Sequence, residues 1–328
     1  MNPGVKIFLA LLLVAGAAFF VLELTSTEVS LENPTRANII IPSQVKLYAV
    51  GDIMLDRGVE YMINRFGDGD FRFPFFKIKE KLREADILFG NLESVISDKG
   101  EKVGSIYSFR ADIQALEGLK YAGFNVLSLA NNHMFDYQRV ALEDAMLRLE
   151  EQGIEYIGAG FNAKEAFSVK IKEVKGVKIG FLAYTNLGPV FWRAKLENGT
   201  GLAWIDRNSF SYLKENIKEA KEKVDVLVVS LHAGVEYALE PTQFQEDFAH
   251  LCIEQGADLV LVHHPHVVQR IEKYKQAWIA YSLGNFVFDQ GFSEKTMESI
   301  ILKVIIENKK IKQVVAEKVK LNPFFQPE

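Results

Sequence analysis

The sequence predicts an α/β protein built on mixed sheets, and two observations support this fold class. First, short apolar runs alternate with helical segments, a spacing typical of parallel strands joined by helical crossovers. Second, residues 168–184 and 299–321 alternate apolar and charged side chains around turns at residues 175–176 and 307–310. This pattern predicts antiparallel hairpins with one solvated face. We therefore expect parallel and antiparallel strands together in one folded domain.

The expected elements follow in order along the chain. Apolar, β-branched runs suit strands covered on both faces, and they lie at residues 45–50, 85–89, 124–130, 224–231 and 257–262. Amphipathic or charged segments predict helices at residues 59–66, 73–84, 111–121, 137–152, 210–222 and 241–255. The fifth strand must end before Pro265, because proline cannot donate to a strand ladder. That places His263, His264 and His266 in a loop at the carboxyl end of this strand.

Composition limits the classes of partner and cofactor. The 328 residues are 48% hydrophobic, enough for a large core, and 38 basic against 43 acidic residues leave a net charge of -5. This charge gives no global attraction for nucleic acid, so we expect no nucleic-acid partner. The one cysteine, Cys252, excludes an intramolecular disulfide and a thiolate metal cluster.

The first residues predict a membrane-directed segment. Sixteen uncharged residues, 7–22, lie between Lys6 and Glu23, close to the lower limit of about seventeen for a membrane-spanning helix. An uncleaved signal anchor competes with a signal peptide cleaved near Ala15 to Ala17. We assign residues 1–24 to this segment, 25–44 to a polar linker and 45–328 to the folded domain. We expect a single-pass cell-membrane protein with an extracytoplasmic domain, or a secreted protein if the segment is cleaved.

Polar side chains follow the predicted strands at the points where they end. Since carboxyl ends of parallel strands share one edge of a sheet, we expect these side chains to converge on one rim. The candidate metal ligands are Asp52, Glu93, Asn132, His232, His264 and His266. Imidazole and carboxylate together suit zinc, manganese or iron, and this set could hold one ion or two. Such a site acidifies bound water, which predicts a metal-dependent hydrolase or transferase acting on phosphate, ester or amide.

Two further residues are candidates for acid–base work. His133 is the expected general acid or base, because its neighbour Asn132 is the more natural ligand. Asp136 either fixes the tautomer of His133 or caps the helix beginning near Tyr137.

Substrate contacts are expected from five residues near the strand ends. Arg57 and Arg110 either clamp an anion or are solvated surface residues. Glu236 either orients His232 or is an exposed carboxylate. Asn91 and Asn285 are expected as polar walls of the substrate pocket.

Seven ordered motifs resemble the CapA family of poly-γ-glutamate capsule biosynthesis proteins. They lie at residues 51–57, 85–93, 109–111, 128–136, 232–237, 264–269 and 281–286. This family is similar in fold to calcineurin-like metallophosphoesterases, so the resemblance implies a four-layer αββα sandwich of two mixed sheets around a two-metal site. It places Asp52, Asn132, His232, His264 and His266 on ligand positions and His133 on the proton-donor position.

The resemblance also has departures and functional implications. The wider phosphoesterase pattern has histidine at the place of Met54 and aspartate at the place of Asn91, for which Glu93 is a possible substitute. The implied role is synthesis, export or anchoring of poly-γ-glutamate or a similar anionic envelope polymer, alongside other capsule-synthesis membrane proteins. A non-catalytic polymer-binding component and a general phosphatase are the alternatives.

Overall fold

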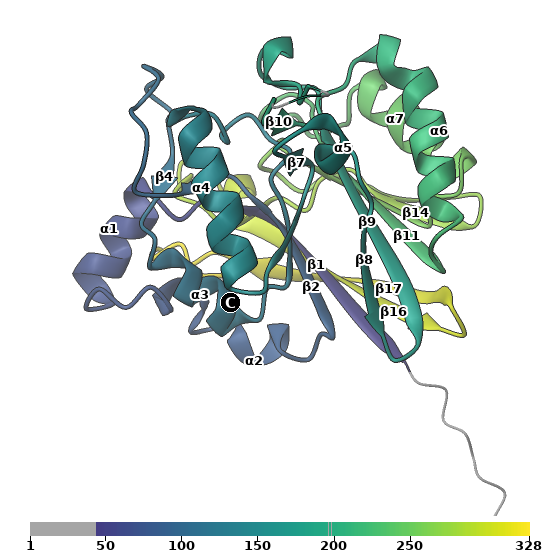
Figure 1. Ribbon diagram of the computed structural model, residues 1–328. Coiled ribbons are helices and arrows are strands. Elements are labelled where there is room, and N and C mark those ends of the chain that lie inside the picture. Colours follow the sequence, from purple (N-terminus) through teal and green to yellow (C-terminus); the bar gives the residue numbers. More distant parts are fainter. Residues whose placement is uncertain (1–43, 196, 198) are drawn as a thin grey trace, which may run out of the picture. The chain divides into compact units, whose positions relative to one another are not determined.

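A computed structural model describes residues 44–195, 197 and 199–328, which form two sheets with helices packed against them (Figure 1). The predicted anchor, residues 1–24, and nearly all of the predicted linker lie outside the described residues. Within the described part of the chain, no helix has the length and apolarity needed to cross a bilayer.

The first sheet has seven strands in the order β17-β16-β1-β2-β5-β6, with β15 beside β1. Its parallel members are β1 (Val45–Ile53), β2 (Ile87–Leu92), β5 (Val126–Ser128), β6 (Glu155–Ile157) and β15 (Asn285–Val287). The hairpin of β16 (Glu298–Glu307) and β17 (Lys310–Lys320) adds the antiparallel edge. Parallel strands thus extend from β1 to β6 at the opposite edge of the sheet.

The second sheet has six strands in the order β13-β14-β12-β11-β9-β8. Its parallel members are β9 (Val177–Thr185), β11 (Val226–His232), β12 (Leu259–His263) and β14 (Ala277–Ala280). Antiparallel partners at the two edges are β8 (Lys170–Val174) and β13 (Ile271–Tyr274). The expectation of a mixed α/β fold with two mixed sheets is confirmed. His263 was wrongly expected in the loop, because it still pairs with His232 as the last residue of β12.

Two short pairs complete the strands. They are β3 (Val95–Ile96) with β4 (Arg110–Ala111), and β7 (Ala159–Gly160) with β10 (Gly201–Leu202).

The helices cover the outer faces of the two sheets. Those packed on the first sheet are α1 (Arg57–Phe66), α2 (Lys79–Leu82), α3 (Ala115–Ala122) and α4 (Gln138–Glu151). Those packed on the second are α5 (Ala163–Ala166), α6 (Phe210–Lys221) and α7 (Gln243–Glu254). The long helix expected over residues 73–84 is instead a 3-10 turn, Phe73–Phe75, followed by α2. Edge-to-face packing of Phe73 on Phe76 and Phe324 overrides the helical propensity there.

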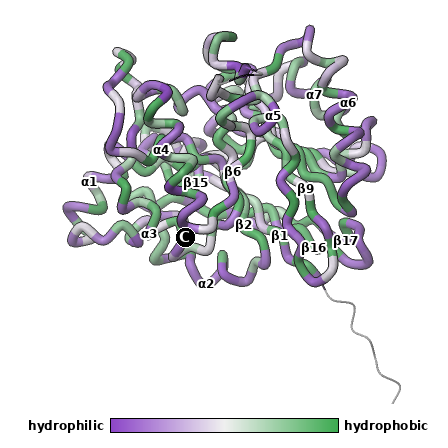
Figure 2. Tube along the Cα trace, in the orientation of Figure 1, coloured by the Kyte–Doolittle hydropathy of each residue, from purple (hydrophilic) through white to green (hydrophobic). Residues whose placement is uncertain are grey.

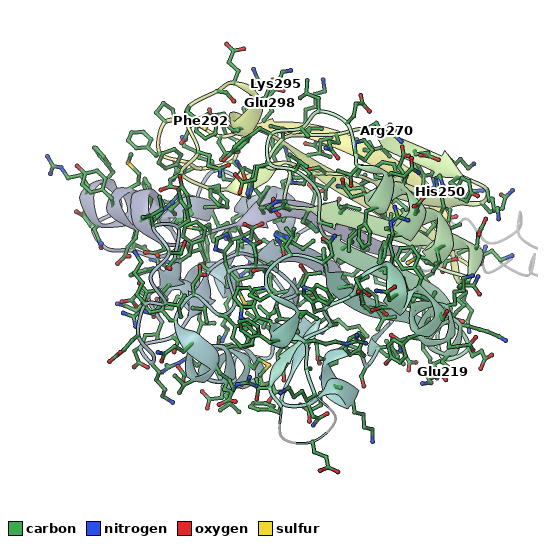
Figure 3. The ribbon with its side chains drawn as sticks, turned by 90° about the horizontal axis from the view of Figure 1, so that it is seen from above. Glu219, His250, Arg270, Phe292, Lys295 and Glu298 are labelled. Carbon is green, nitrogen blue, oxygen red and sulfur yellow. The ribbon has the colours of Figure 1, made fainter. Side chains whose placement is uncertain are left out.

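Alternating strand residues divide the core into three apolar layers. Leu47 and Ala49 of β1 face the second sheet, whereas Tyr48 and Val50 face the helices, as the two-residue period of a strand requires. Phe89 and Phe181 stack across the inter-sheet layer with ring centroids 6.3 Å apart. Figure 2 shows hydrophobic colour concentrated along the strands. In Figure 3, charged side chains such as those of Glu219, Lys295 and Glu298 point outward.

A close approach between β1 and the segment before β15 fixes the end of β1. The Asp52 amide donates to the Gly284 carbonyl oxygen over 3.0 Å, and Asp52 lies in register with Asn285. A Cβ atom at Gly51 would lie 1.8 Å from that same carbonyl oxygen. Only glycine therefore fits at position 51, and the contact sets the position of the Asp52 side chain.

We expect Gly51→Ala to destabilise the protein by about 1–3 kcal/mol or more, because the methyl group must displace the 284 backbone. Urea denaturation measures the change in unfolding free energy. The matched control is Gly291→Ala, where the added Cβ would meet nothing closer than 3.4 Å. Equal stability of the two variants would show that the approach is not a constraint.

Candidate metal centre

Strand ends from both sheets meet at one cluster of polar side chains. The first sheet supplies Asp52 at the end of β1 and Asn91 at the end of β2. The second sheet supplies His232 at the end of β11 and His263 at the end of β12, directly opposite each other in register. The expected convergence therefore occurs, but at the junction of two sheets rather than on the rim of one.

Asp52 is the centre of this cluster and is fully buried. Its Oδ1 atom accepts from the Asn91 amide over 2.9 Å and lies 3.3 Å from His263 Nδ1. Its Oδ2 atom lies 3.3 Å from both the His264 backbone nitrogen and His266 Nδ1. One carboxylate thus joins β1, β2 and the loop after β12.

Glu93 places a second fully buried carboxylate in the same cluster. Its amide donates to the Ile53 carbonyl oxygen over 2.7 Å, which continues the β1–β2 pairing beyond β2. Glu93 Oε1 accepts from the Asn91 amide over 2.9 Å and lies 3.6 Å from His232 Nδ1. The expectation that Asn91 contacts substrate is wrong, because this fully buried amide is used within the cluster.

Burial and neighbouring charge push the two carboxyl groups in opposite directions. Burial opposes ionisation of Asp52, but hydrogen bonds from His263 and His266 outweigh it and hold the pKa of Asp52 well below its usual value. Burial, together with the nearby charge of Asp52, raises the pKa of Glu93 well above its usual value. The cluster therefore has one carboxyl group that ionises readily and one that resists ionisation.

The imidazoles of His232 and His264 are kept neutral. Burial, followed by the neighbouring His264, lowers the pKa of His232 well below its usual value. Burial, followed by the neighbouring His266, lowers the pKa of His264 to about 3. A neutral imidazole is the form that ligates a metal, so these side chains are prepared as ligands at neutral pH.

Unsatisfied buried atoms show that the cluster fits a divalent cation. Glu93 Oε2, Nε2 of His263 and Nδ1 of His264 have no hydrogen-bond partner within the described residues. Buried polar atoms without partners are costly, and a metal ion would satisfy them. Ligand atoms of Asp52, Glu93 and His266 lie within 4.8 Å of one another. Met54 is buried and supplies no nitrogen or oxygen side-chain ligand, whereas Glu93 supplies a carboxylate.

His133 and Asp136 form a pair beside this cluster. Asp136 Oδ2 lies 2.7 Å from His133 Nδ1 and also accepts from the Phe109 amide over 2.9 Å. The Phe109 ring stacks on the imidazole with centroids 4.1 Å apart. Helix α4 has Tyr137 at its N-cap without a side-chain capping bond, so Asp136 orients His133 rather than capping the helix.

Asn132 links the pair to the buried cluster. Its Oδ1 atom lies 2.8 Å from His232 Nε2, and its Nδ2 atom lies 3.0 Å from His133 Nε2. The preceding residue, Asn131, donates to Asn91 Oδ1 over 3.3 Å and accepts from the His133 amide over 3.0 Å. Sequence reasoning gave no specific role to Asn131 or His263, although Asn131 lies within the motif at residues 128–136 and His263 was named with the histidine loop.

Of the two arginines that were expected to contact substrate, one lines the cleft and the other does not. Arg57 lines the cleft, where it forms an ion pair with Asp289 and stacks over Phe109. Arg110 does not line this cleft, because its guanidinium donates to the Lys99 and Gly100 carbonyl oxygens and stacks over Tyr137. The alternative in which Arg110 clamps an anion in this cleft is therefore wrong.

Asn285 differs from expectation, whereas Glu236 matches the alternative of an exposed carboxylate. Asn285 is fully buried, and its Oδ1 atom lies 3.0 Å from His266 Nδ1, so it orients that imidazole instead of forming a pocket wall. Glu236 is exposed and groups with His264 and His266 instead of orienting His232.

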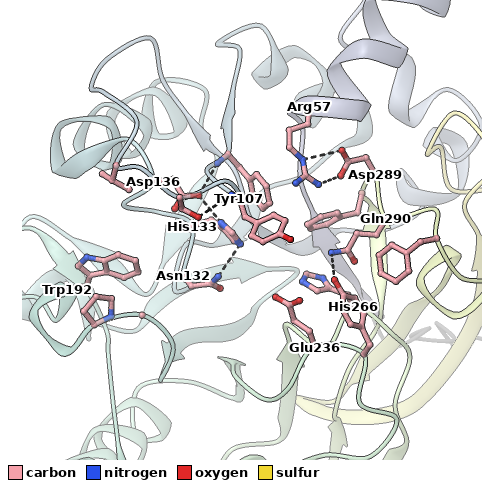
Figure 4. A pocket seen from close by; sticks show the side chains of 18 residues that line it. Arg57, Tyr107, Asn132, His133, Asp136, Trp192, Glu236, His266, Asp289 and Gln290 are labelled. Carbon is pink, nitrogen blue, oxygen red and sulfur yellow. Dashed lines mark hydrogen bonds and ion pairs between the residues drawn. The ribbon is translucent and has the colours of Figure 1, made fainter.

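A cleft of about 830 Å³ opens above the cluster (Figure 4). Asn132, His133 and His266 lie in its wall. Aromatic side chains form much of the rest, including Tyr107, Phe109, Trp192, Tyr237, Phe288 and Phe292. The polar cluster is thus reached from solvent through a largely aromatic opening.

Comparisons with known proteins show the family to which the sequence is similar. The sequence profile of the family described as bacterial capsule synthesis protein PGA_cap matches residues 46–290. The capsule biosynthesis protein CapA of Bacillus anthracis is 35% identical over 262 residues, which are 77% of this chain and 62% of that protein. The PGA biosynthesis protein CapA of Bacillus subtilis is 33% identical over 258 residues, which are 77% of this chain and 66% of that protein. The chain thus spans less than two thirds of the length of these relatives.

A solved structure shares the fold. The crystal structure of a phosphatase from Mycoplasma pneumoniae superposes with a TM-score of 0.54, covers 87% of this chain and 97% of its own, and is 16% identical. The expected resemblance to the CapA family and to the phosphoesterase-type fold is confirmed.

We expect Glu93→Gln to stabilise the metal-free protein at neutral pH, by about 1–3 kcal/mol, since it removes a buried group that resists ionisation. The raised pKa means that wild-type stability is fully present below the usual value of 4.5 and is lost as pH rises through the folded-state pKa. The variant should therefore match the wild type below pH 4.5 and exceed it increasingly above.

Urea denaturation in a chelating buffer across this pH range measures the difference. Glu173→Gln, at an exposed position of β8, is the control and should change little. A Glu93→Gln protein that is less stable than the wild type at neutral pH would contradict the assignment.

Proposed function

The chain belongs to the bacterial capsule synthesis protein PGA_cap family, and we propose that it acts in making, exporting or anchoring poly-γ-glutamate or a similar anionic envelope polymer. The name of the Bacillus subtilis relative, a PGA biosynthesis protein, supports this polymer class. We propose further that the contribution is chemical: hydrolysis or transfer at an amide or ester bond of the polymer through a metal-dependent site.

One observation carries the chemical part of this proposal. Buried ligand-type side chains from two sheets meet at the floor of a cleft, and some of their atoms lack a hydrogen-bond partner within the described residues. Asp52, Glu93, His232, His264 and His266 would hold one or two divalent ions there, with manganese, zinc and iron as the candidates. When bound, such an ion supplies an acidified water and polarises the bond under attack.

The His133–Asp136 pair would manage the proton. Asp136 accepts from both the His133 ring and the Phe109 amide, so the carboxylate is fixed and in turn fixes the imidazole. With Nδ1 held in this way, the proton would be exchanged through His133 Nε2, which lies 3.0 Å from Nδ2 of Asn132, another residue of the cleft wall. Stacking on Phe109 covers one face of the imidazole and restricts its rotation.

The charge of the cleft supports a role for the ion in substrate binding as well. Apart from histidine, Arg57 is the basic residue among the described residues of the cleft wall, and Asp289 already neutralises it. Asp136 and Glu236 add further carboxylates to the wall. An anionic polymer would therefore be repelled unless a cation in the cluster compensated these charges.

A non-catalytic polymer-binding component is the second candidate, and Met54 favours it. This buried thioether stands where the phosphoesterase pattern has a histidine ligand, and Asn91 stands where it has an aspartate. Under this alternative the same cleft would bind the polymer or a capsule-synthesis membrane protein without bond cleavage.

We propose an extracytoplasmic location for the folded domain, based on the uncharged residues 7–22. These residues would anchor the chain in the cell membrane or, if cleaved, direct its secretion.

We expect metal-loaded protein to cleave a member of a panel of poly-γ-glutamate, other envelope polymers and simple phosphate esters. His133→Ala should lower kcat by about 10²–10⁴-fold, since it removes the proton donor. Asp136→Asn should lower kcat by about 10–100-fold, because the imidazole loses its orienting partner. Steady-state kinetics and end-group analysis of the polymer measure both effects.

Metal content is the control for these variants and should equal that of the wild type, because neither residue is among the proposed ligands. Turnover of phosphate esters alone would favour a general phosphatase. Metal-free protein that fully supports polymer production in cells would overturn the catalytic proposal and leave the binding component.

We expect fractionation of cells to recover the full chain in the membrane fraction, with the folded domain accessible to protease from outside. Deletion of residues 7–22 should retain the protein in the cytoplasm, because the translocation signal is then missing. Recovery of the intact full chain in the cytoplasm would refute this location.

A further inference from the structure

The turn that follows β11 is fixed against the histidine loop that follows β12. The Ala233 amide donates to the His263 carbonyl oxygen over 3.2 Å, and the Tyr237 amide donates to the Pro265 carbonyl oxygen over 2.8 Å. Gly234 has φ of 121°, and a Cβ there would lie 2.8 Å from the Gln245 side chain. These contacts fix the position of the turn, and the turn places the side chain of Glu236 near His264 and His266.

Glu236 forms a second group of ligand atoms on the cleft side of the cluster. One ligand atom each of Glu236, His264 and His266 lies within 4.8 Å of the others. Figure 4 shows the Glu236 carboxylate beside the His266 imidazole, inside the cleft. This group differs from the buried group of Asp52, Glu93 and His266, because its carboxylate is exposed.

Backbone strain is concentrated at the same place. Tyr237, His264 and His266 have φ values of 64°, 98° and 58°, in the left-handed region that non-glycine residues rarely adopt. Such strain persists where the surrounding structure fixes it, and it gathers at functional sites. His264 also keeps a buried Nδ1 atom without a partner within the described residues, which is an independent sign of a missing ligand.

We propose that Glu236, with His264 and His266, binds a divalent cation on the cleft side of the cluster, next to the ion held by Asp52 and Glu93. This inference rests on the proposed metal-dependent function and adds a ligand that the phosphoesterase-type pattern did not supply. His266 Nδ1 lies 3.0 Å from Asn285 Oδ1, so Nε2 is the nitrogen of His266 that remains for the outer ion. The carboxylate of the outer ion is exposed, whereas those of the inner ion are buried, and the outer ion therefore binds more weakly than the inner ion.

The outer position also gives Glu236 a role toward substrate. An ion with few protein ligands keeps coordination positions open to the cleft, which is the property that separates a catalytic from a structural site. Glu236 would hold the outer ion where the cleft meets the cluster, whereas Glu93 would hold the inner ion in the buried part of the cluster. The two carboxylates thus divide the site into an inner and an outer half.

Manganese(II) titration of the full chain, followed by calorimetry and by electron paramagnetic resonance, tests this assignment. The wild type should bind two ions in two affinity classes and give the signal of a coupled pair. Glu236→Gln should weaken the weaker class by about 10-fold or more and remove the coupled signal, while the tighter class remains. Glu93→Gln should weaken the tighter class.

Glu240→Gln is the matched control, because this exposed carboxylate lies on the same segment but pairs with Arg270 outside the cleft. It should leave both classes unchanged. A wild type with one class of site, or a Glu236→Gln variant that keeps both classes at wild-type affinity, would overturn the inference. Ion counting needs no turnover, so two bound ions without any cleavage would reject the catalytic proposal and leave this assignment in place.

Discussion

The arrangement of the site depends on the buried negative charge of Asp52, which its close polar neighbours compensate. A carboxylate taken fully out of water is tolerated only with close partners, and Asp52 finds them in two imidazoles, the Asn91 amide and the His264 backbone. Asn91 belongs to the first sheet, whereas the histidines follow a strand of the second. Neutralising this charge therefore requires the two sheets to meet at their carboxyl ends in one relative position.

The apolar layer between the sheets makes that requirement compatible with a stable fold. Leu47, Phe89 and Phe181 are fully buried there, and the stacked phenylalanines connect the two sheets directly. Burying a side chain of this kind stabilises a protein by roughly 1.5–3 kcal/mol. The strained histidine loop and the unsatisfied atoms of the cluster are costs, and this layer offsets them. The polar end of the sandwich can then remain prepared for a cation.

The chain departs from the phosphoesterase pattern without losing acidic ligands. Met54 supplies no nitrogen donor, and Asn91 supplies no carboxylate. Glu93, which is two residues after Asn91 and just beyond the end of β2, brings a carboxylate to the same cluster. Asn91 becomes a donor that bridges Asp52 and Glu93. Glu236 adds an exposed carboxylate on the cleft side. The acidic groups have moved along the sequence while the place of the site in the fold is retained.

The sequence by itself determined the strands, the mixed class of the sheets and the polar residues at the strand ends, because periodicity and turn chemistry depend on near neighbours in the chain. It also drew attention to His133, Asp136 and the histidine loop. Only the tertiary structure decided that Asn91 and Asn285 lie within the buried polar cluster, that Arg110 turns away from the cleft, and that Glu236 lies beside His264 and His266. The direction of a side chain beyond a strand end depends on pairing with strands distant in sequence, and a shift of one residue reverses the face that it occupies.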